Sequence, residues 1–153
     1  MKKREFDVIE FLERLDELTM NCETEEEVRE IYIEEMEKLI EQGVIVDSVI
    51  TDPPYSTTQC AWDRVIPFED MWDCLHRICP NGPIVLFAKQ PFTSNLVMSN
   101  VSEFRENIVW LKNKSGNGFS ADQRHIQVLE DIVVFSEKAK YTFNPQKWLV
   151  EDK

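Results

Sequence analysis

The sequence predicts an α/β fold in which helices cover both faces of a sheet and an acidic helical hairpin comes first. Apolar residues recur at helical spacing through the first 42 residues. After Gly43, short β-branched runs alternate with helical patterns, which is typical of a layered sheet with right-handed crossovers. A length of 153 residues with a hydrophobic share of 42% is enough for a sizeable core.

The N-terminal 43 residues predict two helices with a strongly acidic surface, because they hold 15 acidic and 6 basic side chains. Thr24 and Glu27 have the spacing of a capping box, and Gly43 is a plausible stop for the second helix. The helical apolar positions are Val8, Phe11, Leu12, Leu15 and Leu18, then Val28, Ile31, Tyr32, Met36, Leu39 and Ile40. The hairpin is interpreted as a helical layer packed on the sheet or, alternatively, as a partner or dimer surface.

The remaining elements follow in alternation. The run from Val44 to Thr51 predicts a fully buried parallel strand. Further along we expect a helix after Pro67, a turn over Pro80–Pro83, a strand over Ile84–Ala88, a short helix over Thr93–Met98, and strands near Asn107–Lys112 and Asp131–Ser136. Trp72 and Trp110 lie on periodic faces, so we expect both in the core.

Asp52-Pro53-Pro54-Tyr55 follows the first predicted strand, and ligands of open α/β sheets bind beyond the carboxyl ends of strands. Two prolines make the exit rigid and remove two amide donors. The Asp52 carboxylate and the Pro53 carbonyl could accept both hydrogens of an exocyclic amine and so localise its lone pair, while Tyr55 stacks on a flipped base. The alternative for the tetrapeptide alone is an ordinary strand-to-turn exit.

The chain also resembles the DNA N6-adenine or N4-cytosine amino-methyltransferases, in the phage-type group whose catalytic motif precedes the cofactor motif. The resemblance runs from about Val46 to Gln146 in family order. It is carried by Asp52-Pro53-Pro54-Tyr55, Thr57–Asp63 with Ile66–Phe68 and Met71-Trp72, Gly82–Phe87, Gln90–Ser94, Phe104-Arg105, Val109–Lys112, Gly118-Phe119, Glu130–Phe135 and Tyr141–Gln146. Ser56 departs from the glycine that usually follows the motif, and Leu129 departs from a frequent histidine.

This resemblance implies a Rossmann-like methyltransferase sheet that is only partly present, with Asp52, Pro53, Pro54 and Tyr55 as the catalytic residues. It implies S-adenosylmethionine (SAM) as cofactor, with Asp52 and Pro53 contacting it. The family's Phe-x-Gly-x-Gly loop lies after the region seen here, so this chain represents the catalytic half. Gly116–Ala121 fits G-x-G-x-x-A, with Glu137 about 20 residues on, but it is separated from its strand and favours a loop beside the site.

Double-stranded DNA is the expected partner, although a net charge of -12 weighs against a basic footprint. The expected DNA contacts are Tyr55, Thr57, Trp62, Lys112, Lys114 and Arg124, and Phe92 could also line the base pocket. A solvated loop is the alternative for the basic residues. Asp63 and Asp70 are interpreted as surface or capping residues.

The expected organisation is an extension over 1–43, a catalytic region over 44–146 and a tail or truncated connection over 147–153. The four cysteines have no metal-like spacing, so we expect reduced thiols, no metal, and the cytoplasm of a bacterium or phage-infected host, with no membrane segment. The function expected is site-specific DNA methylation, most simply at adenine N6, in restriction-modification or phage biology. The alternatives are a non-catalytic DNA- or protein-binding module and one half of a split enzyme.

The missing cofactor strands place the catalytic strand at an edge of the sheet in this interpretation. Unpaired edges attract other chains. We therefore expect the edge to be covered by the N-terminal helices, by a second copy in a homodimer, or by a complementing C-terminal half.

Overall fold

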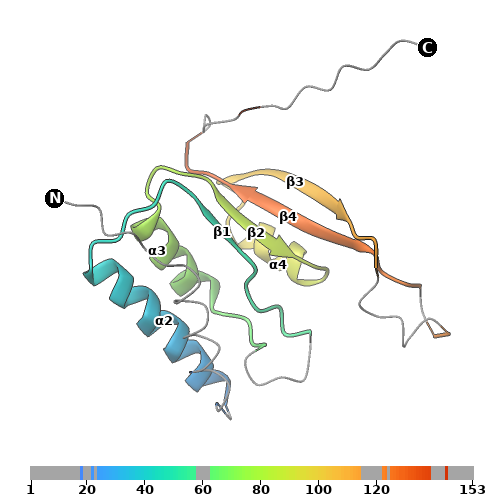
Figure 1. Ribbon diagram of the computed structural model, residues 1–153, viewed down its shortest axis with the longest axis horizontal. Helices are drawn as coiled ribbons and strands as arrows, with labels where there is room; N and C mark the ends of the chain where they lie inside the picture. The colour runs from blue at the N-terminus through green and yellow to red at the C-terminus, as the bar shows by residue number, and fades with distance from the viewer. Residues whose placement is uncertain are drawn as a thin grey trace.

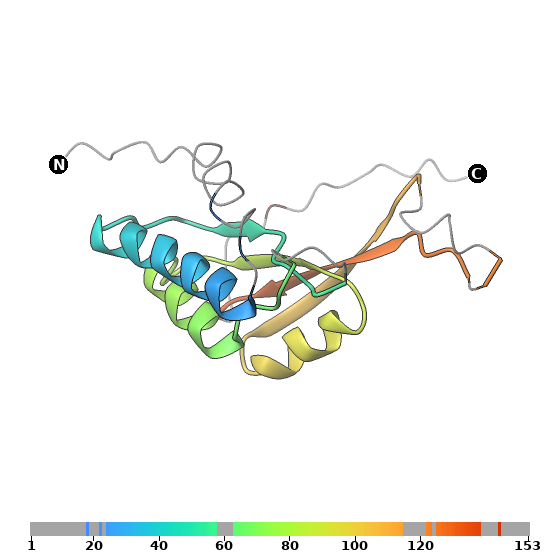
Figure 2. The same cartoon turned by 90° about the horizontal axis from the view of Figure 1, so that it is seen from below.

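The computed structural model describes residues 24–57, 63–114 and 125–138, together with positions 18, 22, 122, 123 and 144. Its strands form one four-stranded sheet in the order β1-β2-β4-β3 (Figure 1). The elements are α2 (Glu25–Glu41), β1 (Val49–Thr51), α3 (Phe68–Ile78), β2 (Ile84–Ala88), α4 (Phe92–Ser99), β3 (Phe104–Leu111) and β4 (Leu129–Phe135). The predicted α/β class, a sheet flanked by helices, is confirmed, although the helices of the described residues cover one face of the sheet and not the expected two (Figure 2).

Helix α2 begins and ends where the sequence predicts. The Thr24 hydroxyl accepts the Glu27 amide at 3.2 Å, and the Glu27 carboxylate accepts the Thr24 amide at 3.1 Å, which completes the capping box. The helix ends at Glu41, and Gly43 has a φ of 69°, the left-handed conformation that glycine adopts without a steric penalty. The first predicted helix lies outside the described residues.

Helix α2 packs against α3, and two ion pairs join their surfaces. Arg29 binds Asp70 at 2.7 Å, and Arg77 binds Glu37 at 2.5 Å. Met36 and Ile40 reach the hydrophobic core from the apolar side of α2. The second helix of the expected hairpin is therefore a layer of the fold, and Asp70 takes part in holding it. In Figure 2, α2, α3 and α4 lie on the same side of the sheet.

Strand β1 is parallel to β2, as predicted, but the prediction of a fully buried strand over Val44–Thr51 was wrong. Only Val49–Thr51 form the strand, and Ile50 is 68% exposed. The preceding residues bond to helix ends instead: the Val44 amide donates to Leu39 O at 3.0 Å and the Val46 amide to Ile78 O at 2.9 Å. Val49 packs against the core, so Ile50, the next residue of the strand, lies on the opposite face of the sheet, away from the described helices.

The core lies between the helices and one face of the sheet. Alternate β2 residues, Ile84, Leu86 and Ala88, are buried against apolar side chains of α3 and α4. Trp72 is 7% exposed, which confirms its predicted core position, and its ring packs edge-on against Phe135 of β4. The turn before β2 is as predicted. It needs glycine, because a Cβ on Gly82 would lie 1.9 Å from the Asp47 carbonyl oxygen.

Strands β3 and β4 form an antiparallel pair at the other side of the sheet, so the sheet is mixed. The prediction that Trp110 belongs to the core was wrong, since it is 46% exposed on the edge strand β3. Its neighbours in the strand alternate between the two faces, and both faces are open there. None of the helices in the described part of the chain is both long and apolar enough to cross a membrane.

Candidate active site

Asp52-Pro53-Pro54-Tyr55 leaves β1 at the carboxyl end of the strand, as the sequence predicts. Strands β1 and β2 run parallel, and β4 is antiparallel to both β2 and β3, so the carboxyl ends of β1, β2 and β3 lie at the same end of the sheet as the start of β4. Both prolines are buried, whereas Asp52 is exposed and Tyr55 is half-buried. The motif therefore presents an acid and an aromatic ring from a rigid base.

Asp63 holds the loop that follows the motif, a role that the sequence interpretation missed. It is 3% exposed, so the expectation of a surface or capping residue was wrong about its burial. Its carboxylate accepts three successive backbone amides, from Tyr55 at 2.9 Å and from Ser56 and Thr57 at 2.8 Å. The two prolines have no amide to offer, so these are the first amides available after Asp52. The spacing from Tyr55 to Asp63 was the only signal in the sequence.

Ser56 occupies the left-handed region with a φ of 57°. A side chain is disfavoured there, whereas glycine adopts the conformation freely. This explains in physical terms why the resembled family usually carries glycine after its motif. The three hydrogen bonds to Asp63 hold the serine in this conformation.

Tyr55 contacts both the acid and the apolar wall of the site. Its hydroxyl donates a hydrogen bond to Asp52 Oδ1. Its ring lies against the buried Phe92 of α4, with ring centroids 5.1 Å apart. The rings of Phe92 and Phe68 of α3 also pack together, with centroids 5.8 Å apart. Three aromatic rings from different segments thus form a cluster next to Asp52. Phe92 thus lies behind Tyr55.

The pKa of Asp52 is raised, mainly because the surrounding protein removes part of the hydration of its carboxylate, although the residue is exposed. The negative charge of Glu130 raises this pKa further, the positive charge of Lys112 lowers it, and Asp63 adds a small upward effect. A carboxylate with a raised pKa is a stronger hydrogen-bond acceptor and a better base than an ordinary surface aspartate. The electrostatic environment of Asp52 therefore includes Glu130 on β4 and Lys112 beyond the end of β3.

Lys112 follows β3 and forms an ion pair with Glu130, which is 11% exposed in its side chain. Its ammonium group also lies 5.3 Å from the centroid of the Trp110 ring. Of the other predicted DNA contacts, Lys114 and Thr57 are exposed, while Trp62 and Arg124 lie outside the described residues, as does the Gly116–Ala121 loop. The structure thus places Asp52, Tyr55, Thr57 and Lys112 at one end of the sheet, the end where β1 and β3 finish.

Asp131 of β4 connects its strand to α4 and β3 near the same end of the sheet. Its carboxylate accepts hydrogen bonds from the Thr93 hydroxyl of α4 at 2.7 Å and from the Asn107 side-chain amide of β3 at 3.0 Å. Asp131 also lines a cavity of about 410 Å³ with Lys89, Gln90, Gln127 and apolar residues of the segment before β4. A polar recess therefore adjoins the carboxyl ends of the strands.

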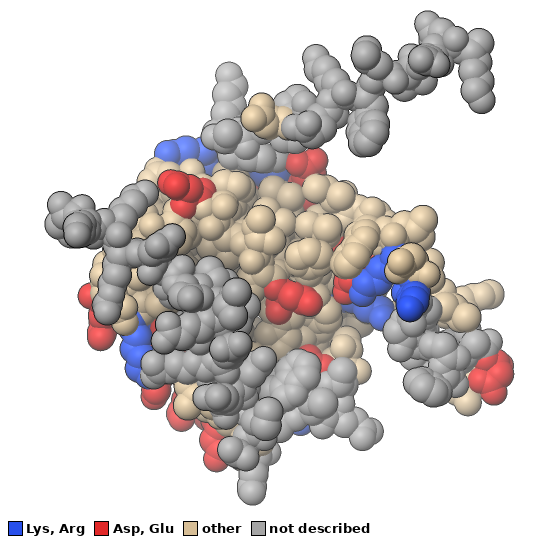
Figure 3. Space-filling model, viewed as in Figure 1, with Lys and Arg blue, Asp and Glu red and all other residues tan. Residues whose placement is uncertain are grey.

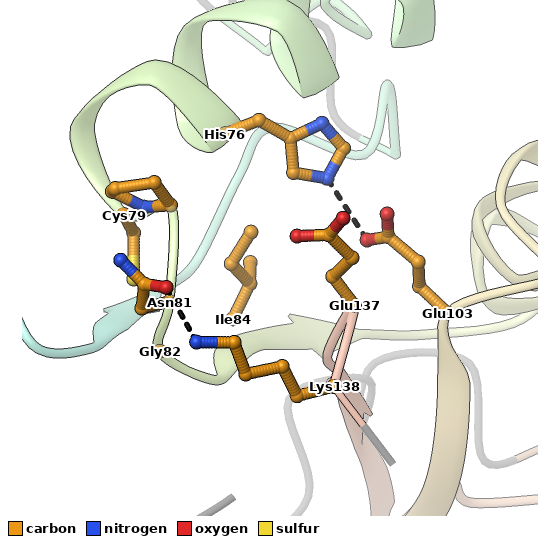
Figure 4. A pocket seen from close by; sticks show the side chains of 9 residues that line it. His76, Cys79, Asn81, Gly82, Ile84, Glu103, Glu137 and Lys138 are labelled. Carbon is orange, nitrogen blue, oxygen red and sulfur yellow. Dashed lines mark hydrogen bonds and ion pairs between the residues drawn. The ribbon is translucent and has the colours of Figure 1, made fainter.

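A second cavity, of about 250 Å³, lies at the amino end of β2 and so at the end of the sheet opposite to Asp52 (Figure 4). His76 and Glu103 form an ion pair at 2.9 Å across it, and Lys138 bonds to the Asn81 side chain. Glu103 also accepts the Asn100 side-chain amide at 3.0 Å. These groups satisfy one another and tie the turn before β2 to the segments around β3 and β4.

Solved structures that are similar to this chain include two of M1.HpyAVI. The structure of the M1.HpyAVI–SAM complex aligns with a TM-score of 0.55 at 25% identity, over 77% of this chain and 58% of that one. M1.HpyAVI without SAM aligns with a TM-score of 0.54 at 25% identity, over 76% and 57%. The chain thus spans less than two thirds of M1.HpyAVI. No protein-family model and no curated protein sequence matches the chain. The fold is methyltransferase-like.

Proposed function

We propose that this chain is the catalytic segment of a DNA amino-methyltransferase that uses SAM and methylates the exocyclic amine of a flipped base, adenine N6 in the simplest case. The observation that carries the proposal is the Asp52 carboxylate, which is exposed at the carboxyl end of an edge strand on a rigid Pro-Pro exit. The similarity to M1.HpyAVI, one of whose structures contains SAM, supports the choice of cofactor.

The proposed chemistry begins with an exocyclic amine, a poor nucleophile because its lone pair is delocalised into the base. The Asp52 carboxylate and the Pro53 carbonyl accept its two hydrogens, which localises the lone pair on nitrogen. The raised pKa of Asp52 strengthens this acceptor and suits it to take the proton that the amine loses. SAM, when bound, supplies an electrophilic methyl group, and the new N–C bond replaces the bond from that methyl to sulfur.

Tyr55 is the proposed platform for the base. One face of its ring is backed by Phe92, so a base would stack on the opposite face. The Tyr55 hydroxyl donates to Asp52 Oδ1, so Oδ2 is the oxygen left to accept the amine, since no hydrogen bond reaches it from the residues that the structure describes. Asp63 positions this ring, because it binds the amide of Tyr55 itself.

The described residues supply only part of a cofactor site. Asp52 and Pro53 are placed to contact SAM, but the only glycines in the described segments are Gly43 and Gly82, and neither belongs to a glycine-rich loop. We therefore expect weak or no SAM binding by the chain alone, because the adenosine and methionine parts of the site would come from a complementing segment. Calorimetric titration tests this expectation, and micromolar affinity would contradict it.

Methyl transfer in the presence of a complementing segment tests the role of Asp52. Asp52→Ala should abolish transfer of radiolabelled methyl groups to DNA, since the amine loses its acceptor. Asp47→Ala is the matched control, because Asp47 is an exposed aspartate at the other end of the same strand. Activity that survives in Asp52→Ala would sink the assignment.

A further inference from the structure

Strand β3 presents an unusual edge. In the part of the chain that the structure describes, β3 pairs only with β4 and lies last in the sheet. Four successive apolar residues are exposed there, on both faces: Ile108 by 47%, Val109 by 55%, Trp110 by 46% and Leu111 by 69%. Natural edge strands usually carry charges or prolines that prevent pairing with another chain. This stretch has neither and is suited to an interface.

The hydrogen-bonding side of each β3 residue follows from its pairing with β4. The Lys112 amide donates to Val128 O at 2.7 Å, so it points toward β4. Amides alternate in direction along a strand. The amides of Leu111, Val109 and Asn107 therefore point toward the open edge, where they can pair with an added strand.

We propose that β3 pairs with β3 of a second copy of this chain, antiparallel, with the twofold axis at Val109. In this register Ile108 lies opposite the partner's Trp110, and the reverse pair repeats across the axis. Glu106 lies opposite the partner's Lys112. Each end of the paired segment therefore carries one attractive pair of charges between the two copies. The occupant is a second copy because the strand is complementary to itself in both apolar and charged positions.

Neighbouring registers lack this match. An axis at Trp110 would place Lys112 opposite the partner's Ile108, with an apolar residue facing the charge. The axis at Val109 instead places Lys112 between its own Glu130 and the partner's Glu106. Figure 3 looks onto the face of the sheet away from the described helices, where the surface is largely uncharged across the strands. Pairing at β3 would make that surface continuous between the two copies.

Sedimentation velocity of the full chain over a concentration series tests the dimer, whose mass should be twice 18.1 kDa. Val109→Pro should give a monomer, because it removes an outward amide while proline is tolerated on an edge strand. The matched control is Ile50→Pro on β1. The Val49 amide donates to Pro83 O at 3.1 Å, so the Ile50 amide also points outward, and this variant should remain dimeric. Circular dichroism checks that both variants fold.

A charge reversal tests the register. Glu106→Lys should raise the dissociation constant about tenfold or more, because two attractive pairs become repulsive. The triple variant Glu106→Lys/Lys112→Glu/Glu130→Lys should restore the dimer, because it reverses both the pair between the copies and the pair that Lys112 makes within each copy. A chain that is monomeric at every concentration, a dimer that survives Val109→Pro, or one that Ile50→Pro dissociates instead would overturn the proposal. Equal weakening by the single variant and the triple variant would contradict the register.

Discussion

The two edges of the sheet differ in length, in chemistry and in what holds them. The β1 edge has a three-residue strand, and the loop beyond it is held by side-chain bonds from Asp63 to the backbone. The β3 edge has an eight-residue strand, held by a regular ladder with β4 and exposing mainly apolar side chains. The candidate active site lies at the β1 edge, which has the shorter run of strand pairing. There, a buried carboxylate takes the place of strand pairing in positioning the reactive groups.

Replacing Asp63, which holds the loop at the β1 edge, should produce the largest change in the free energy of unfolding. Asp63→Ala leaves three amides without their acceptor, and we expect the free energy of unfolding to fall by about 3 kcal/mol, since bonds to charged groups are each worth about 1.5–3 kcal/mol and do not add fully. Urea unfolding measures the change. Asn107→Ala, which removes one exposed bond from the β3 edge, should cost about 1 kcal/mol or less. Equal losses would show that the two edges are held alike.

A glycine at position 56 should act in the opposite direction. Ser56→Gly relieves a side chain at a φ of 57°, so we expect a gain of about 0.5–1 kcal/mol in the free energy of unfolding. Thermal unfolding at neutral pH is a sufficient measurement. Ser48→Gly is the control: Ser48 lies before the same strand without a positive φ, and its replacement should be neutral or slightly destabilising. A loss of stability in Ser56→Gly would refute the strain argument.

The smallest expected effect is electrostatic and links the two edges. Glu130→Gln removes a charge that raises the pKa of Asp52, so this pKa should fall, whereas Lys112→Met should raise it. NMR titration of the Asp52 carboxyl carbon follows both changes. Because amine polarisation requires ionised Asp52, activity should be lost as pH falls through this pKa, and the loss should occur at lower pH in Glu130→Gln. Identical titrations in wild type and both variants would mean that the edges are not coupled.

Local signals in the sequence were sufficient for much of this architecture. The capping box at Thr24 and Glu27, the stop at Gly43, the helix after Pro67 and the short helix over Thr93–Met98 depend on neighbouring residues and are confirmed. The position of the Asp-Pro-Pro-Tyr motif at a strand end also followed from the apolar run before it. Its catalytic role remains a prediction.

The features that the sequence did not reveal depend on tertiary context. Apolar runs look the same in a buried strand and in an edge strand, so neither the exposure of Ile50 nor that of Trp110 could be read from periodicity. Asp63 resembles any polar loop residue until the fold brings it under the amides of Tyr55, Ser56 and Thr57. The coupling of Asp52 to Glu130 likewise requires the strand order, because 78 positions separate them in the chain.

Nucleoside analysis of the methylated DNA tests the central claim most directly. Duplex DNA incubated with SAM, this chain and a complementing cofactor-binding segment would be digested to nucleosides and examined by mass spectrometry, with Asp52→Ala in parallel. The proposed role of Asp52 predicts a methyl group on an exocyclic amine, as N6-methyladenine, that is absent from the Asp52→Ala sample. Methylation of a ring carbon, or an amine product that does not depend on Asp52, would contradict it.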